Sequence, residues 1–200
     1  RDSLMSDLNA YLEQKRKAFH TRQERIESGQ ADAVQLKASV SAEGRSGVRL
    51  LRIRDHRVIS DSPADFAGYD LGPSSPELQL GVLGTCVTHI FLIQAADQQV
   101  PLNNLRVDVQ GTLDPRAGKP GHEHTPFWPH DIAYTVHIDS PASAAQIQQL
   151  FESVEAVCPI LNLLKNPQTI RAQWVHTNTL DGVTPARPAA QAVNDDRAAA

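Results

Sequence analysis

The sequence predicts an α+β domain, in which antiparallel strands are separated by long helices. Two segments with strand-like alternation come early, two more follow a long apolar helix, and a second helix and a last strand close the domain. Apolar residues make up 40% of the 200 residues, the share of an ordinary folded protein. A chain of this length suits one well-packed domain with extensions.

Residues 3–28 are predicted to form an amphipathic helix. Apolar side chains recur there at every seventh position, and a glycine follows as a stop signal. These side chains are Met5, Leu12, Phe19 and Ile26. The apolar stripe covers one side only, so the helix must pack against the domain or a partner chain.

The next segment is predicted to form a β-hairpin. Apolar residues alternate over residues 34–40 and again from residue 48 to residue 53. Between them, residues 44–47 supply a glycine-flanked turn with Arg45 inside it. Residues 60–75 contain several prolines and glycines, and they predict an irregular connection.

A central helix is predicted from Ser74 or Ser75 to about Asp97. Either serine can cap the helix, and Glu77 complements the positive end of the helix dipole. Apolar side chains lie nearly all round this helix, which is the pattern of a buried central helix. Cys86 lies at its middle.

Two further strands are predicted at residues 105–113 and 132–138, as antiparallel neighbours on either side of a loop rich in proline and histidine. A helix then begins at residues 140–141, and Pro159 interrupts it directly after Cys158. A short helical turn follows at residues 161–164.

The last predicted strand covers residues 169–175. The remaining residues are rich in Ala, Pro and Asp, which predicts a disordered tail. We therefore expect a helical extension at residues 1–30, a domain at residues 31–178 and a tail at residues 179–200.

The charge and hydropathy of the chain argue against two classes of partner, nucleic acids and membranes. The formal charge is only −4, and the basic residues are scattered among acids, so no nucleic-acid partner is expected. The longest apolar run, residues 81–93, is short for a bilayer span and contains polar side chains, so no membrane partner is expected. These features predict a cytoplasmic protein.

Cys86 and Cys158 are the only cysteines. A structural disulfide is disfavoured in the cytosol, so the pair is either inert or catalytic, and a small buried thiol is the common case. The pair has no CxxC spacing. The histidines of residues 122–124 and His130 lack an obvious fourth ligand and suit a polar loop. No metal or cofactor is predicted.

Three stretches resemble the OsmC/Ohr family of hydroperoxide-resistance proteins. Residues 76–86, which begin Pro-Glu-Leu and end at a cysteine, are similar to the family's helix with the reactive cysteine. Residues 154–159 resemble the later helix that ends at the second cysteine, and residues 99–109 resemble the link between helix and strand. Order and spacing agree over residues 34–175.

The resemblance implies an OsmC-like fold, with curved antiparallel sheets around two long central helices. It also implies an intertwined homodimer with two sites at the interface, to which the first helix is an extension. The implied activity is thiol-dependent reduction of hydroperoxides in oxidative-stress defence. The apolar surroundings of Cys86 would favour organic hydroperoxides over hydrogen peroxide, because an alkyl chain gains by leaving water. Cys86 would become a sulfenic acid, Cys158 would close a disulfide, and a dithiol such as a lipoylated protein would reduce it.

The resemblance also implies an arginine and an acid beside the reactive thiolate. Arg45 matches the arginine of the family's early turn, with Arg49 as the fallback; an exposed turn arginine is the alternative. Glu77 matches the acid with a shift of one residue, although nine positions place it opposite Cys86 on an ideal helix, where it would serve only the dipole. His89 shares the face of Cys86 and would either assist the thiolate or simply pack.

Two other classes of function stay open. The chain would be an OsmC-like protein that binds a small apolar ligand if its cysteines are merely packed. It would be a redox sensor if its thiol is oxidised without turnover and a partner docks on the first helix.

Overall fold

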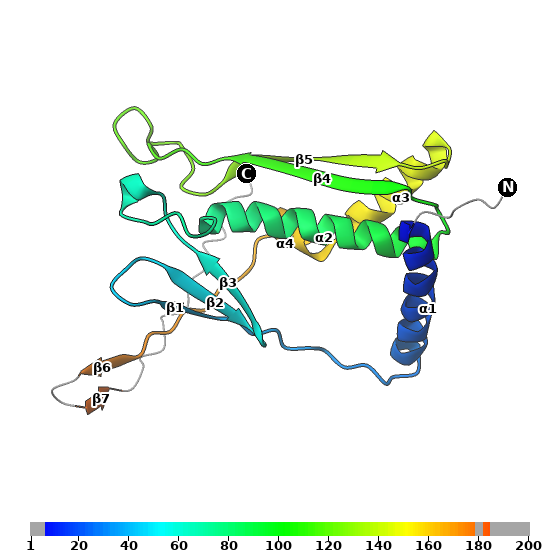
Figure 1. Cartoon of the computed structure of the whole chain (residues 1–200). Helices are drawn as coiled ribbons and strands as arrows, with labels where there is room; N and C mark the ends of the chain where they lie inside the picture. The colour runs from blue at the N-terminus through cyan, green and yellow to red at the C-terminus, as the bar shows by residue number, and fades with distance from the viewer. Residues whose placement is uncertain (1–6, 179–181, 185–200) are drawn as a thin grey trace, which may run out of the picture. The chain divides into compact units, whose positions relative to one another are not determined.

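The structure, a computed structural model, describes residues 7–178 and 182–184 (Figure 1). The chain divides into two compact units, residues 1–162 and residues 163–200. The first unit contains three helices and two antiparallel sheets, which confirms the α+β class. Its elements are α1 (Asp7–Glu27), β1 (Ser39–Ala42), β2 (Arg49–Ile53), β3 (His56–Ser60), the 3-10 turn η1 (Ala64–Phe66), α2 (Ser75–Asp97), β4 (Asn104–Thr112), β5 (His130–Asp139) and α3 (Ala144–Val157), and it ends within α4 (Pro159–Lys165). The second unit contains β6 (His176–Asn178) paired with β7 (Gly182–Thr184).

β1 and β2 form the predicted hairpin, and Arg45 lies in its turn. The first strand begins later than predicted: residues 34–38 lie outside β1, and the alternating Val34 and Leu36 are exposed rather than packed. β3 was not predicted from the sequence; it pairs with β2 to complete an antiparallel sheet of three strands. The turn between them has no glycine, and Arg54 takes a positive φ of 54°. Because such a φ usually selects glycine or asparagine, the ordinary turn signal is missing from the sequence.

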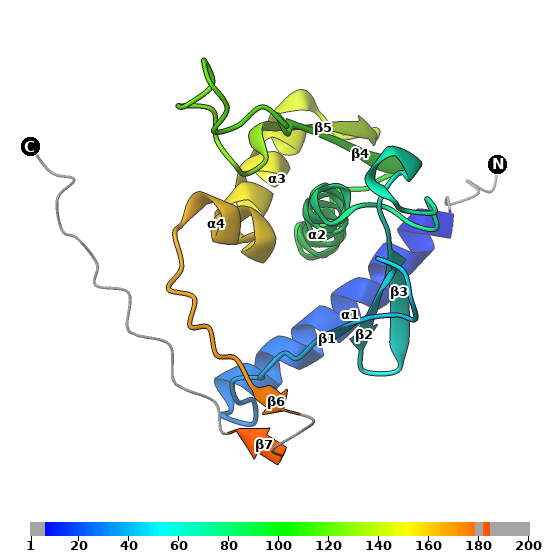
Figure 2. The same ribbon diagram turned by 90° about the vertical axis from the view of Figure 1, so that its left-hand side faces the viewer.

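β4 and β5 pair from Asn104 opposite Asp139 to Thr112 opposite His130, as predicted. Half-buried residues alternate with exposed residues along both strands. The half-buried side chains pack against the core, and they include Leu105, Val107, Val109, Ile132, Tyr134, Val136 and Ile138. In Figure 2, which looks nearly along α2, this hairpin and α3 lie on one side of the helix.

The core lies along one stripe of α2. Its fully covered residues are Leu83, Val87, Phe91 and Ala95, spaced four apart, together with Ala96. α1 contributes Leu12 to this core and α3 contributes Leu150 and Val154. The prediction of burial on every side is not met within one chain, because Val82 remains 43% exposed. By length and composition α2 would also suit a membrane span, a test that core helices of soluble proteins pass too.

Other predicted boundaries also differ from the structure. α3 begins at Ala144, because Ser143 caps it in a reciprocal pair with Gln146. The strand predicted at residues 169–175 is wrong: Ile170 and Val175 are exposed, and the strand β6 begins at His176. Residues 3–6 of the first helix and residues 179–181 and 185–200 of the predicted tail lie outside the described residues.

Candidate thiol site

Cys86 and Cys158 meet at the contact between α2 and α3. Their Sγ atoms are 3.6 Å apart, so both are free thiols within reach of a disulfide, whose bond length is about 2.05 Å. Cys158 is 0% exposed, whereas Cys86 is half-buried. Solvent therefore reaches part of Cys86, whereas Cys158 is enclosed.

Pro159 determines where the second cysteine lies. A residue before proline is restricted to extended conformations, and Cys158 has φ −65° and ψ 112°. α3 therefore ends at Val157, and α4 starts directly at Pro159. The break leaves Cys158 between two helices with its Sγ against α2.

Burial raises the pKa of the Cys86 thiol. The backbone N–H of Ile160 donates to Cys86 and lowers this pKa, while the neighbouring Cys158 raises it further. Arg45 is not among the groups that act on Cys86 within the described chain. One chain by itself therefore favours the protonated thiol.

His89 lies on α2 close to Cys86 in sequence, but its surroundings disfavour the protonated imidazole. Partial burial and the ammonium group of Lys15 lower the pKa of His89 below its ordinary value. The imidazole is therefore neutral near pH 7, which favours the packing alternative over assistance by a protonated ring.

Glu77 acts as a helix cap in this chain. Its Oε2 accepts hydrogen bonds from the backbone N–H of Ser74 (2.7 Å) and from the Ser74 hydroxyl (2.6 Å), and these bonds lower the pKa of Glu77. Within the described residues it makes no bond to Cys86, in line with its place on the other side of the helix. Ser74 is the N-cap, as one of the two predicted choices.

The two candidate arginines have different surroundings. Arg49 donates to the carbonyl oxygen of Gly47 (3.0 Å), the hydroxyl of Ser60 (3.1 Å) and the carbonyl oxygen of Asp61 (2.9 Å). These bonds tie the hairpin turn to the end of β3, so Arg49 has a structural role. Arg45 is exposed and makes no hydrogen bond or ion pair to any described residue.

Sequence reasoning missed a polar pair beside Cys158. The Tyr134 hydroxyl donates to Glu155 Oε1 at 2.5 Å, and the Tyr134 ring stacks on Phe151 with 6.2 Å between centroids. Burial and Glu155 raise the pKa of Tyr134, so the phenol stays protonated and ties β5 to α3. The alternation along β5 placed Tyr134 on the inward face, but nothing in the sequence indicated its partner.

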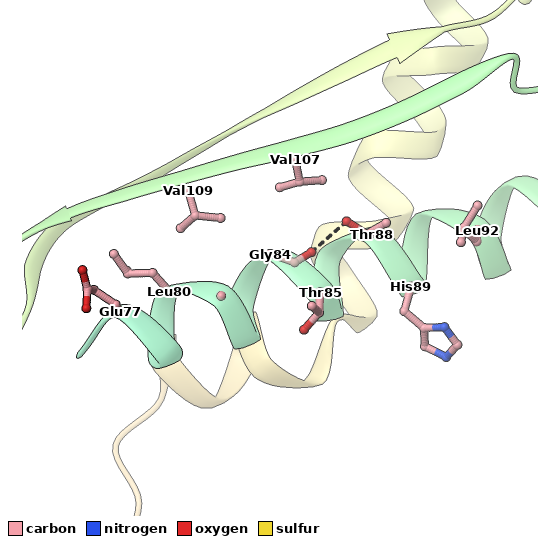
Figure 3. Close-up of a pocket in the computed structure, with 10 residues that line it drawn as sticks. Glu77, Leu80, Gly84, Thr85, Thr88, His89, Leu92, Val107 and Val109 are labelled. Carbon is pink, nitrogen blue, oxygen red and sulfur yellow. Dashed lines mark hydrogen bonds between the residues drawn. The ribbon is translucent and has the colours of Figure 1, made fainter. Parts of the chain in front are cut away.

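An apolar groove of about 700 Å³ runs between α2 and β4 (Figure 3). Val107 and Val109 point from the strand toward the helix, and β4 approaches closely at Gly84, where a Cβ would lie 3.2 Å from Val109. Thr88 donates its hydroxyl to the Gly84 carbonyl oxygen at 2.8 Å, so that this polar group is satisfied. Cys86 is not among the lining residues, and His89 points away from β4.

Across the part of the chain that the structure describes, no three metal-ligating side chains come together. At the start of β5, His130 Nδ1 instead lies 2.8 Å from Asp131 Oδ2.

A family model described as OsmC-like protein matches residues 68–173. The match includes Cys86, Cys158 and Glu77, but not α1 or Arg45. Among curated proteins, no sequence matches this chain.

Solved structures show the same fold at low sequence identity. An OsmC-like protein from Mycoplasma pneumoniae has a TM-score of 0.59 and 18% identity, covering 68% of this chain and 90% of that one. An organic hydroperoxide resistance protein OsmC from Legionella pneumophila has a TM-score of 0.50 and 15% identity, covering 68% and 93%. An OsmC-like protein of unknown function from Vibrio cholerae has a TM-score of 0.51 and 12% identity, covering 65% and 93%.

Proposed function

This chain belongs to the OsmC-like protein family, and we propose that it is a thiol-dependent peroxidase that reduces organic hydroperoxides in the cytoplasm. The observation that carries the proposal is the 3.6 Å separation of the sulfur atoms of Cys86, a half-buried residue, and Cys158, a fully buried one. The description of the Legionella relative as an organic hydroperoxide resistance protein supports the same activity.

The proposed reaction has three steps. The Cys86 thiolate attacks a peroxide oxygen, the O–O bond breaks, and the alkoxide takes a proton to leave as an alcohol, which leaves a sulfenic acid on Cys86. Cys158 then attacks this sulfur, the S–O bond breaks, water leaves, and a disulfide forms. A dithiol, of which a lipoylated protein is one kind, returns both cysteines to thiols by exchange.

The thiolate of the first step needs a cation that one chain does not bring to Cys86. We propose a homodimer in which the partner subunit's Arg45 approaches Cys86, because a nearby positive charge favours the thiolate. Two features support this arrangement. Arg45 is exposed and unpaired among the described residues, and the groove beside α2 is an apolar surface that a second chain would cover.

Arg45→Ala is expected to slow the reaction of Cys86 with cumene hydroperoxide at pH 7 by about tenfold or more, since a nearby charge shifts a pKa by roughly 1–3 units. A guanidinium stabilises the thiolate and lowers its pKa, so its removal raises the pKa and reduces the thiolate fraction at neutral pH. The pH dependence of Cys86 alkylation by iodoacetamide measures this shift. Arg57→Ala, at an exposed arginine on β3, is the control; an Arg45→Ala profile equal to that of the control would contradict the assignment.

Thiol mapping tests the function itself. The reduced protein is treated with a slight excess of cumene hydroperoxide, and its cysteines are identified by mass spectrometry. We expect a disulfide between Cys86 and Cys158, formed faster than with hydrogen peroxide, because an alkyl group gains by leaving water beside the apolar core. If both thiols stay reduced, the peroxidase proposal fails.

One observation favours ligand binding as a second candidate function. The groove between α2 and β4 is apolar and of the size of small-molecule sites, and burial raises the pKa of Cys86. Failure of the thiol mapping would direct the search for a ligand to this groove. A single oxidation of Cys86 without catalytic consumption of peroxide would instead indicate a redox sensor.

A further inference from the structure

The junction between α3 and α4 lacks two of the hydrogen bonds that a continuous helix would make. In such a helix, the N–H groups of residues 159 and 160 would donate to the carbonyl oxygens of Glu155 and Ala156. Pro159 has no N–H to donate. The N–H of Ile160 instead acts on Cys86, whose pKa it lowers. Both carbonyl oxygens therefore need another donor, because unsatisfied backbone groups destabilise a fold.

Asn162 supplies that donor. Its side-chain Nδ2 lies 3.2 Å from the carbonyl oxygen of Glu155 and 3.4 Å from that of Ala156. The same Nδ2 lies 2.8 Å from the carbonyl oxygen of Cys158, which also accepts the Asn162 backbone N–H at 3.0 Å. The carboxamide of Asn162 thus replaces the missing donors, and it also forms a hydrogen bond with the backbone of Cys158.

We propose that Asn162 is a positioning residue of the thiol site. Its carboxamide donates hydrogen bonds to the backbone carbonyl oxygens at the end of α3. The Ile160 N–H therefore remains available to Cys86, and Cys158 stays beside Cys86. Without the carboxamide, the Ala156 carbonyl oxygen would compete for the Ile160 N–H, which is its partner in a regular helix. Cys86 would then lose the one backbone donor among the described residues that lowers its pKa.

Two consequences follow for the chemistry. An N–H that donates to a thiolate stabilises the charged form, so Asn162 acts on the reactivity of Cys86 through Ile160. Disulfide closure requires the two sulfur atoms to approach from 3.6 Å, and a loosened junction would make this approach rarer. The second consequence rests on the proposed peroxidase function, whereas the first does not.

The test compares Asn162→Ala and Asn162→Asp in the full chain. The aspartate keeps the size of the side chain but cannot donate from its ionised carboxylate, so it separates the hydrogen bonds from the volume they occupy. Gln148→Ala is the matched control, because Gln148 is an exposed carboxamide on α3 that bonds only to Glu152 among the described residues. Alkylation of Cys86 by iodoacetamide is measured against pH in a Cys158→Ser background, and disulfide closure by stopped flow with both cysteines present.

For both Asn162 variants, we expect alkylation of Cys86 at pH 7 to slow by roughly tenfold, the typical effect of a lost hydrogen bond to a charged group, and its pH midpoint to rise. Disulfide closure after cumene hydroperoxide should slow by a similar factor. Variants that melt earlier but keep the control's alkylation profile and closure rate would overturn the proposal, because Asn162 would then be merely structural.

A measurement on the unmodified protein covers the case in which the variants do not fold. The amide resonance of Ile160 should shift in nitrogen-15 NMR spectra as Cys86 ionises, and an amide that does not respond overturns the proposal. The alkylation and NMR measurements use no peroxide, so their outcome does not depend on the proposed peroxidase function. If the unmodified protein forms no disulfide, the proposed function fails while the role of Asn162 at Cys86 is still decided.

Discussion

Cys86→Ser is expected to abolish catalytic consumption of cumene hydroperoxide, with a loss on the order of a thousandfold or more, because a serine hydroxyl does not ionise at neutral pH and is a weak nucleophile. Cys158→Ser should behave differently: it should consume one equivalent of peroxide per chain and hold a sulfenic acid on Cys86. Peroxide assays and mass spectrometry after dimedone trapping measure the two outcomes.

Thr85→Ser is a suitable control, because Thr85 is the exposed neighbour of Cys86 on α2 and its hydroxyl bonds to the Val82 carbonyl oxygen, which a serine also reaches. Its rate should equal that of the unmodified protein. Retained turnover in Cys86→Ser would show that another group reduces the peroxide. A Cys158→Ser protein that consumes no peroxide would instead assign the first attack to Cys158.

Phe91→Ala is expected to lower the free energy of unfolding by about 3–5 kcal/mol, the usual cost of deleting a buried phenylalanine ring. Phe91 is 0% exposed on the covered stripe of α2, and its ring centroid lies 6.0 Å from that of Phe151 on α3. The truncation would leave a cavity between the two long helices that carry the cysteines. Urea denaturation measures the change, at one fixed protein concentration because dimerisation would contribute to stability.

Phe66→Ala is the matched control for this core substitution. Phe66 ends the 3-10 turn η1 and is 81% exposed, so its truncation should change stability by no more than about 0.5 kcal/mol. Equal effects of the two substitutions would mean that Phe91 does not lie in a packed core.

The elements that could be predicted are those with strong local signals. α2 carries a capping serine and a long apolar pattern, and β4 and β5 carry strict alternation. β3 was not predicted because the turn before it places Arg54 at a positive φ, which arginine rarely adopts. The last strand was placed too early because residues 169–175 alternate without burying their apolar side chains.

The candidate site was predictable only where residues are adjacent in sequence or match the family pattern. The resemblance paired Cys86 with Cys158, and the structure places their sulfur atoms together. Helix geometry already put Glu77 on the far side of α2, where the structure finds a cap. The proposed role of Asn162 depends on its contacts with three backbone carbonyl oxygens around a proline break, two of which lack their helical donors there, and no sequence pattern indicates this arrangement.

The difference in exposure between Cys86 and Cys158 would also decide the order in which the substrates react. In the oxidised protein, only the Cys86 half of the disulfide would face solvent, because Cys158 is enclosed by the core. A reductant must then bond first to Cys86 and expel Cys158 as the leaving thiol. Peroxide and reductant would both react at Cys86, so they could not bind there at the same time. The two substrates would therefore react in alternation, which is a ping-pong mechanism.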